Sequence, residues 1–211
     1  MDYSNPLGIE YRIVNEIVHL DQPARVVSGS RNYETDPNDL WDALTNADRI
    51  PRWFLPISGN LELGGQYQLK GNAGGKITRC DPPKKLEVTW EYGGNVSWVH
   101  VTLEPTSDKT KLTLEHITGK DEASEQHWKQ FGPGATGVGW DLGFLGLGLH
   151  LVTGETINQE EANQWYITDA GKEFIRRCAE AWGTSHIESG ESVETAKELA
   201  EQTAKAYTGE L

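Results

Sequence analysis

Cysteine and methionine are scarce in this chain of 211 residues, which has two Cys and one Met. Cys80 and Cys178 lie far apart in the sequence and neither belongs to a CxxC pair, so neither a disulfide framework nor a zinc site is indicated. A chain of this length can bury a sizeable apolar core without disulfides or a structural metal ion. We therefore predict a fold that needs no metal and no cofactor.

Basic charge is also in short supply, with 19 Lys and Arg against 32 Asp and Glu and a net charge of −13. Nucleic acids and anionic membranes both bind basic patches, so we expect neither as a partner. The most apolar stretch, residues 138–152, contains Asp141 and His150 and is too short to span a bilayer. Residues 1–20 show no signal pattern, and we expect a cytoplasmic protein.

Common catalytic motifs are missing as well. A GxGxxG pattern occurs at residues 132–137, but no predicted strand leads directly into it, so it does not indicate a dinucleotide site; GxxxxGKS/T, HExxH and GxSxG are absent. The six His show no spacing typical of metal ligands. We therefore assign no catalytic residue, although the pattern leaves an enzyme open.

Alternation of apolar and polar residues dominates residues 57–117, with Gly-rich and Pro-rich turns between the segments. This pattern predicts an antiparallel sheet. In its last three strands the apolar residues share one face and the polar residues share the other, as in a sheet covered on one side. The predicted strands are 25–34, 57–63, 66–71, 75–80, 85–92, 96–104 and 110–117.

One helix, predicted over residues 137–152, is the best candidate to cover the apolar face. It carries two apolar stripes, so we expect it to be buried on more than one side. Gly143, Gly146 and Gly148 each cost about 1 kcal/mol relative to Ala in a helix. Two reasons for this cost stay open: a close approach of the helix to the sheet, or space beside it for a guest molecule.

The two ends of the chain form additions to this core. Residues 1–22 form a short helix or an extra strand, and residues 23–154 form the main domain. Residues 155–211 are acidic and predict three helices, at 160–165, 169–182 and 192–207. We expect this extension to fold back on the main domain, with a dimer contact as the alternative.

A candidate binding site follows from aromatic residues and one His on the predicted inner face. His116 follows Leu112 and Leu114 on that face, and either a plain hydrogen bond at the rim or a ligand would satisfy it. Residues 121–137 predict an aromatic-bearing loop, either a lid or a loop pinned by its aromatics. For the aromatic residues, simple core packing is the alternative. The predicted ligand-binding residues are Trp53, Phe54, Trp90, Tyr92, His116, Trp128, Trp140 and Phe144.

Four segments of the sequence resemble a known family. They are Asp36 to Thr45 with its Trp-Asp-Ala-Leu run, Arg49 to Pro56 with Arg-Trp-Phe, Thr110 to His116, and Gly139-Trp-Asp141. Together they resemble the bacterial proteins similar to the activator of heat-shock protein 90 ATPase, within the START-like (SRPBCC, Bet v 1-like) superfamily. The resemblance covers about residues 25–152 and is specific for fold rather than for ligand.

The resemblance implies an α+β helix-grip fold, in which six or seven antiparallel strands curve around a long C-terminal helix. It also implies an internal cavity for an apolar small molecule such as a lipid, a polyketide or an aromatic compound. Two alternatives stay open: a cyclase or hydrolase that uses a cavity His, and a module associated with a chaperone in the stress response. Fold analogy alone does not decide among them.

Overall fold

The structure is a computed structural model of the chain, and it describes residues 8–211 apart from the side chain of Gln159. Residues 1–7 of the predicted N-terminal extension lie outside the described residues. The elements are β1 (Tyr11–His19), β2 (Gln22–Tyr33), α1 (Pro37–Thr45), the 3-10 helix η1 (Ile50–Arg52), β3 (Ile57–Gly59), β4 (Gln66–Leu69), β5 (Gly74–Asp81), β6 (Lys85–Tyr92), β7 (Asn95–Pro105), β8 (Thr110–Gly119), α2 (Glu122–Phe131), α3 (Gly134–Thr153), α4 (Gln159–Tyr166), α5 (Asp169–Glu188) and α6 (Val193–Thr208).

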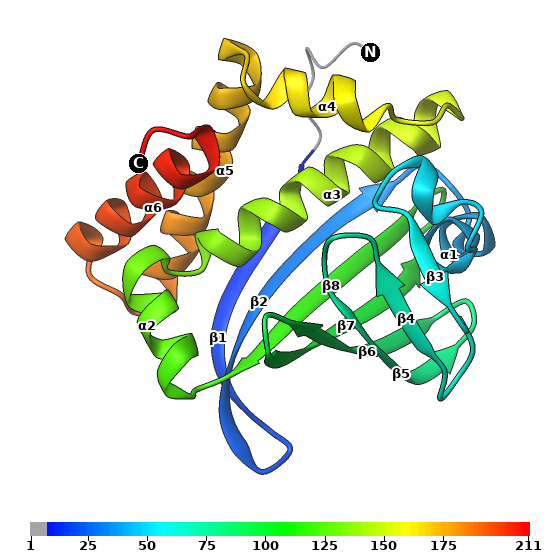
Figure 1. Ribbon diagram of the computed structural model, residues 1–211, viewed down its shortest axis with the longest axis horizontal. Coiled ribbons are helices and arrows are strands. Elements are labelled where there is room, and N and C mark those ends of the chain that lie inside the picture. The colour runs from blue at the N-terminus through cyan, green and yellow to red at the C-terminus, as the bar shows by residue number, and fades with distance from the viewer. Residues whose placement is uncertain (1–7) are drawn as a thin grey trace. The chain divides into compact units, whose positions relative to one another are not determined.

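The strands form one eight-stranded sheet in the order β1-β2-β8-β7-β6-β5-β4-β3, visible in Figure 1. This confirms the predicted α+β helix-grip fold. The predicted count of six or seven strands was too low, because the segment that we left as a helix or a strand is the edge strand β1. Its residues alternate only weakly between buried and exposed, which explains why the pattern was ambiguous.

The register of β6, β7 and β8 places the apolar residues on a common face, as predicted. Val88 lies opposite Val99, and Val99 lies opposite His116. Directly paired residues of antiparallel strands point to the same side of a sheet. We call this side the inner face; its buried members are Val88, Val99, Val101, Leu103, Leu112 and Leu114.

The described chain divides into two compact units. The first unit contains residues 8–29, 119–145 and 158–211, and the second contains residues 30–118 and 146–157. Strand β2 and helix α3 each run from one unit into the other.

The first unit is organised around Asp141 on α3, whose side chain is fully buried. Its carboxylate accepts hydrogen bonds from the Ile9 backbone N–H at 2.8 Å, from Arg12 at 2.6 Å and from the Trp182 indole at 2.8 Å. These contacts hold β1, α3 and α5 together. In this unit α5 and α6 lie side by side, as Figure 1 shows.

Helix α2 replaces the loop that we predicted between residues 121 and 137. Asp121 caps it, because its carboxylate accepts a hydrogen bond from the Ser124 backbone N–H at 2.8 Å. The Gly-rich and Pro-rich residues that suggested a loop are confined to the segment after the helix. A lid made of an irregular loop is therefore wrong for residues 122–131.

Helix α3 is longer at both ends than predicted, and in the described chain it alone is long and apolar enough to cross a membrane. Just over half of its most apolar window is buried within the protein, as expected for the core helix of a soluble domain. Two of its glycines allow close approach within the second unit. A Cβ on Gly146 would come within 2.6 Å of the Trp53 carbonyl oxygen, and one on Gly148 within 3.2 Å of the Arg31 guanidinium.

Candidate functional site

A polar pair lies within the apolar inner face of the second unit. His116 Nε2 and Ser97 Oγ are 2.9 Å apart, and Ser97 Oγ also donates a hydrogen bond to the Trp90 carbonyl at 3.1 Å. A hydroxyl has one hydrogen, so Ser97 must accept from His116. The proton of the imidazole is thereby placed on Nε2.

The imidazole of His116 is uncharged at neutral pH. Although part of the residue remains accessible, burial lowers the pKa of His116 to about 4, because the charged form would lose its hydration. The Trp90 ring lies beside it in an edge-on arrangement, with ring centroids 6.0 Å apart. The site therefore combines an aromatic wall with a neutral hydrogen-bonding group.

Exposure rises along β6 toward its turn into β7. Val88 is buried, Trp90 is half-buried, and Tyr92 is 61% exposed next to the Gly93-Gly94 turn. All three residues lie on the inner face, because they alternate along one strand. This end of the inner face is the accessible end in the second unit.

Strand β4 contributes a residue to the same sheet that we did not predict. Tyr67 lies opposite Gly75 of β5, and its hydroxyl donates to the Thr89 carbonyl of β6 at 2.7 Å. A Cβ on Gly75 would lie 2.1 Å from that carbonyl oxygen, so only glycine allows this close approach. The Tyr67 side chain therefore reaches past β5 to the β6 backbone.

Two predicted site residues form a separate aromatic contact in the second unit. The Trp53 and Phe54 rings stack with centroids 5.3 Å apart. The Trp53 indole N–H donates to the Ala43 carbonyl of α1 at 2.8 Å. This hydrogen bond gives Trp53 a structural role at the end of α1.

The remaining three predicted residues belong to the first unit. Trp128 lies on α2 between Arg25, whose guanidinium carbon is 4.6 Å from the ring centroid, and His186, whose ring centroid is 5.2 Å away. On α3, Phe144 is buried and Trp140 is half-buried. The structure thus brings Trp90 and His116 together, whereas Trp128 packs on partners that sequence reasoning did not name.

Ser97 is the functional candidate that sequence reasoning missed although a signal existed. Ser97, Val99 and Val101 are every second residue of β7, so they share the inner face. The alternation in the sequence could therefore have assigned Ser97 to that face. Arg25 and His186 gave no such signal. They are far apart in sequence and meet only through the packing of β2, α2 and α5.

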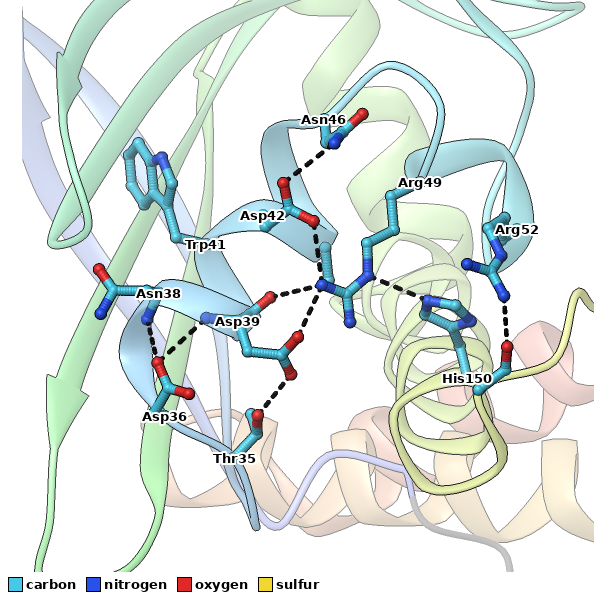
Figure 2. Close-up of polar contacts among 12 residues, drawn as sticks. Thr35, Asp36, Asn38, Asp39, Trp41, Asp42, Asn46, Arg49, Arg52 and His150 are labelled. Atoms are coloured by element: carbon cyan, nitrogen blue, oxygen red, sulfur yellow. Dashed lines mark hydrogen bonds and ion pairs between the residues drawn. The ribbon is translucent and has the colours of Figure 1, made fainter.

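Two of the four segments that carry the family resemblance, residues 36–45 and 49–56, contribute to a network within the second unit, shown in Figure 2. Arg49 donates to the Asp39 carboxylate at 2.7 Å, to the Asp42 carboxylate at 3.0 Å and to the Asp39 carbonyl at 3.0 Å. Its Nε also donates to His150 Nε2 at 3.2 Å. The guanidinium of Arg49, the residue before η1, therefore links α1 to the end of α3.

His150 accepts from Arg49 because its own proton is held elsewhere. Its Nδ1 donates to the Glu155 carbonyl at 2.8 Å, which fixes Nε2 as the acceptor. Next to it, Arg52 donates to the Gly154 carbonyl (Figure 2). The motif residues are therefore structural: they fix the chain that follows α3 rather than present a reactive group.

Comparison with known proteins places this architecture in a family. The sequence profile of the "Activator of Hsp90 ATPase homolog 1-like protein" family matches residues 34–143, more than half of the chain. The chain belongs to this family. No curated protein matches the sequence.

Solved structures agree with this assignment. The crystal structure of CalU16 from Micromonospora echinospora is 30% identical, covers 82% of this chain and 97% of CalU16, and has a TM-score of 0.63. The solution structure of CalU16 is 28% identical, covers 90% and 100%, and has a TM-score of 0.69. The Aha1 dimer from Colwellia psychrerythraea is 17% identical, covers 61% and 97%, and at a TM-score of 0.50 is similar in fold alone.

The family and these neighbours identify the fold as the START-like helix-grip fold, which is a ligand-binding fold. In this family member the inner face carries Trp90, Ser97 and His116. We take these three residues as the candidate functional site of the second unit.

Proposed function

We propose that the inner face of the second unit binds an uncharged, largely apolar small molecule, without chemistry of its own. The observation that carries the proposal is the neutral His116–Ser97 pair, set beside Trp90 among apolar residues. Ligand sites commonly combine an apolar surface with one or two convergent polar groups. We expect the ligand to enter at the Tyr92 end, where exposure is greatest.

Apolar contact supplies most of the expected affinity. Removing about 150 Å² of apolar ligand surface from water contributes roughly 4 kcal/mol. The polar pair adds orientation, because a ligand group left unpaired beside it would lose its hydration without compensation. A neutral imidazole offers hydrogen bonds but no charge, so we expect a hydroxyl or carbonyl at the polar end of the ligand. Lipids, polyketides and aromatic compounds include molecules of this kind.

Two Trp residues on opposite faces of the sheet allow a matched test. Trp90 lies on the inner face, whereas Trp98 pairs with Thr89 and Ile117 on the other face. A fluorescent apolar probe should bind the wild-type protein and be displaced by hydrophobic competitors. Trp90→Ala should weaken it by at least about tenfold, which is about 1.4 kcal/mol, and Trp98→Ala by less than about twofold. Equal losses, or no probe binding by the folded protein, would refute the proposal.

The protonation state of His116 distinguishes binding from catalysis at this site. A His with a pKa of about 4 is a weak base, and at neutral pH it lacks the imidazolium form that acts as a general acid. We therefore expect bound ligands to be recovered unchanged after long incubation. Turnover that is lost in His116→Phe would replace the binding proposal with an enzyme of the cyclase or hydrolase type.

A second candidate rests on the family itself, whose description names an activator of Hsp90 ATPase. A chaperone partner, and a homodimer as described for the Colwellia Aha1, are the interactions this candidate predicts. Adding the purified protein to an Hsp90-type ATPase from the same cell should raise its rate of ATP hydrolysis. An unchanged rate together with a monomeric mass in solution would remove this candidate. From the same family match we also propose that residues 23–154 form the functional domain. We propose in addition that the protein is cytoplasmic.

A further inference from the structure

A polar pocket lies entirely within the first unit. Its volume is about 410 Å³, and its walls are formed by β1, β2, α2, α5 and the chain that follows α5. This volume falls in the range of small-molecule sites. Arg25, Trp128, His186 and Glu191 are among the residues that line it, so the pocket is distinct in chemistry from the apolar inner face.

The positive charge in this pocket is already neutralised. Arg25 donates to both carboxylate oxygens of Glu125, at 2.5 and 3.2 Å, while its guanidinium lies over Trp128. Glu16 also lines the pocket, with a carboxylate oxygen 3.9 Å from Arg25 Nε. Lys120 forms an ion pair with Glu16, so Arg25 and Lys120 are both neutralised and Glu191 leaves the group with a net negative charge that disfavours an anionic ligand.

His186 is the polar group whose hydrogen bonding is incomplete. The residue is 4% exposed, and within residues 8–211 its Nδ1 atom is buried without a hydrogen-bond partner. Its Nε2 atom is 3.9 Å from Glu191 Oε2, which is too far for a hydrogen bond. The other Glu191 oxygen accepts from the Ser192 backbone N–H at 2.8 Å, so the carboxylate is held in place.

The position of the imidazole proton follows from these contacts. Burial lowers the pKa of His186, so the ring is neutral and carries one proton. A proton on Nδ1 would be a buried N–H with no acceptor, which is costly. A proton on Nε2 faces the Glu191 carboxylate instead. His186 therefore presents a donor, and Glu191 an acceptor, across a gap of 3.9 Å.

We propose that this pocket binds a neutral small molecule through a hydroxyl group that bridges His186 and Glu191. The hydroxyl oxygen accepts from Nε2–H and donates to Oε2. An oxygen about 2.8 Å from each atom spans the gap with an angle near 90° at the oxygen. An ammonium group cannot accept a hydrogen bond, and a carboxylate cannot donate one to Glu191. The proposal does not depend on ligand binding at the inner face.

Three probes that share one ring test this requirement: cyclohexanol, cyclohexylammonium and cyclohexanecarboxylate. We would titrate each into the isotope-labelled full chain at up to tens of millimolar and follow the Trp128 indole and His186 imidazole signals by NMR. Cyclohexanol should shift both signals in a saturable way, at least about tenfold more tightly than the charged probes. Signals of Trp90 report separately on the inner face, so failure of one site is distinguishable from failure of the other.

Glu191→Ala should weaken cyclohexanol binding at this pocket by at least about tenfold, because the hydroxyl loses its acceptor. Glu188→Ala, which removes the same charge from an exposed position outside the lining, should leave binding within about twofold. His186→Phe keeps a ring but removes both nitrogens and should also abolish binding. Equal affinity for the charged probes, unchanged affinity in Glu191→Ala, or no saturable shift at Trp128 would each overturn the proposal.

Discussion

The two units each contain a charged network, and the networks differ in burial. Asp141 of the first unit is fully buried, and burial raises its pKa against the opposing pull of Arg12. Around Arg49 in the second unit, the Asp39 and Asp42 side chains are 39% and 49% exposed. Burial favours a higher pKa at Asp39, but the hydrogen bonds from Arg49 and Thr35, together with the charge of Arg49, outweigh it and lower that pKa. The same ion-pair chemistry is therefore a core requirement in one unit and a surface clamp in the other.

The largest effect should come from Asp141→Ala. This change leaves the Arg12 guanidinium, whose side chain is 13% exposed, without its carboxylate. Removing one partner of a buried pair typically costs about 3–5 kcal/mol of unfolding free energy. Urea denaturation of the purified variant measures the loss. Replacing both residues, as in Arg12→Met with Asp141→Leu, should recover only the part of the loss that comes from the unpaired Arg12, because the Ile9 N–H and the Trp182 indole still lack their acceptor. A single variant as stable as the wild type would contradict a core role for Asp141.

The next effect is a pH dependence that comes from His116. Its pKa is about 4 in the folded protein, below the ordinary value near 6.5, so the unfolded chain binds this proton first as the pH falls. The contribution of the neutral ring to stability is complete above pH 6.5. It is lost as the pH falls from 6.5 to 4, by up to about 3 kcal/mol.

Carboxylates and His186 also titrate in acid, so His116→Phe serves as the reference. The difference in unfolding free energy between wild type and variant, measured at pH 7 and at pH 4.5, isolates the His116 contribution. We expect the wild type to lose more stability than the variant. Parallel pH profiles would mean that His116 is not held neutral by the inner face.

A smaller loss is expected for Arg49→Lys. A lysine ammonium keeps the charge but cannot reach Asp39, Asp42 and His150 together in the fixed geometry of a guanidinium. We expect about 2 kcal/mol of destabilisation, concentrated around α1 and residues 154–157. Amide hydrogen exchange should show faster exchange there and unchanged rates in α5 and α6. Uniformly faster exchange would argue against a local clamp.

The smallest effect should follow Asp42→Ala, the half-exposed counterpart of Asp141→Ala. Exposed ion pairs contribute up to about 1 kcal/mol, and Asp39 still binds Arg49 in the variant. The loss should shrink further in high salt, because exposed charges are screened. A loss as large as that of Asp141→Ala would remove the distinction between the two networks.

Sequence periodicity predicted most of the fold because the inner face has a strict two-residue period. The strands at 85–92, 96–104 and 110–117 were placed to within about two residues. Helix α2 was missed because its own residues are polar and the Gly and Pro after Phe131 dominated the pattern. Local composition therefore masked a helix that is fixed by the Asp121 cap.

The candidate sites were predictable only in part. Trp90 and His116 share the inner face, so alternation along two neighbouring strands sufficed to bring them together. The Arg25, Trp128 and His186 cluster depends on tertiary packing between β2, α2 and α5, which no local pattern encodes. For the same reason, Arg49 and His150 were not linked in advance although they are in hydrogen-bond contact.

Nuclear Overhauser effects between a bound apolar probe and the labelled protein test the central proposal most directly. We expect contacts from the probe to the Trp90 indole and the His116 ring, with the polar end of the probe nearest to Ser97. Contacts confined to Trp98 or to other residues of the outer face, with none to Trp90 or His116, would contradict it.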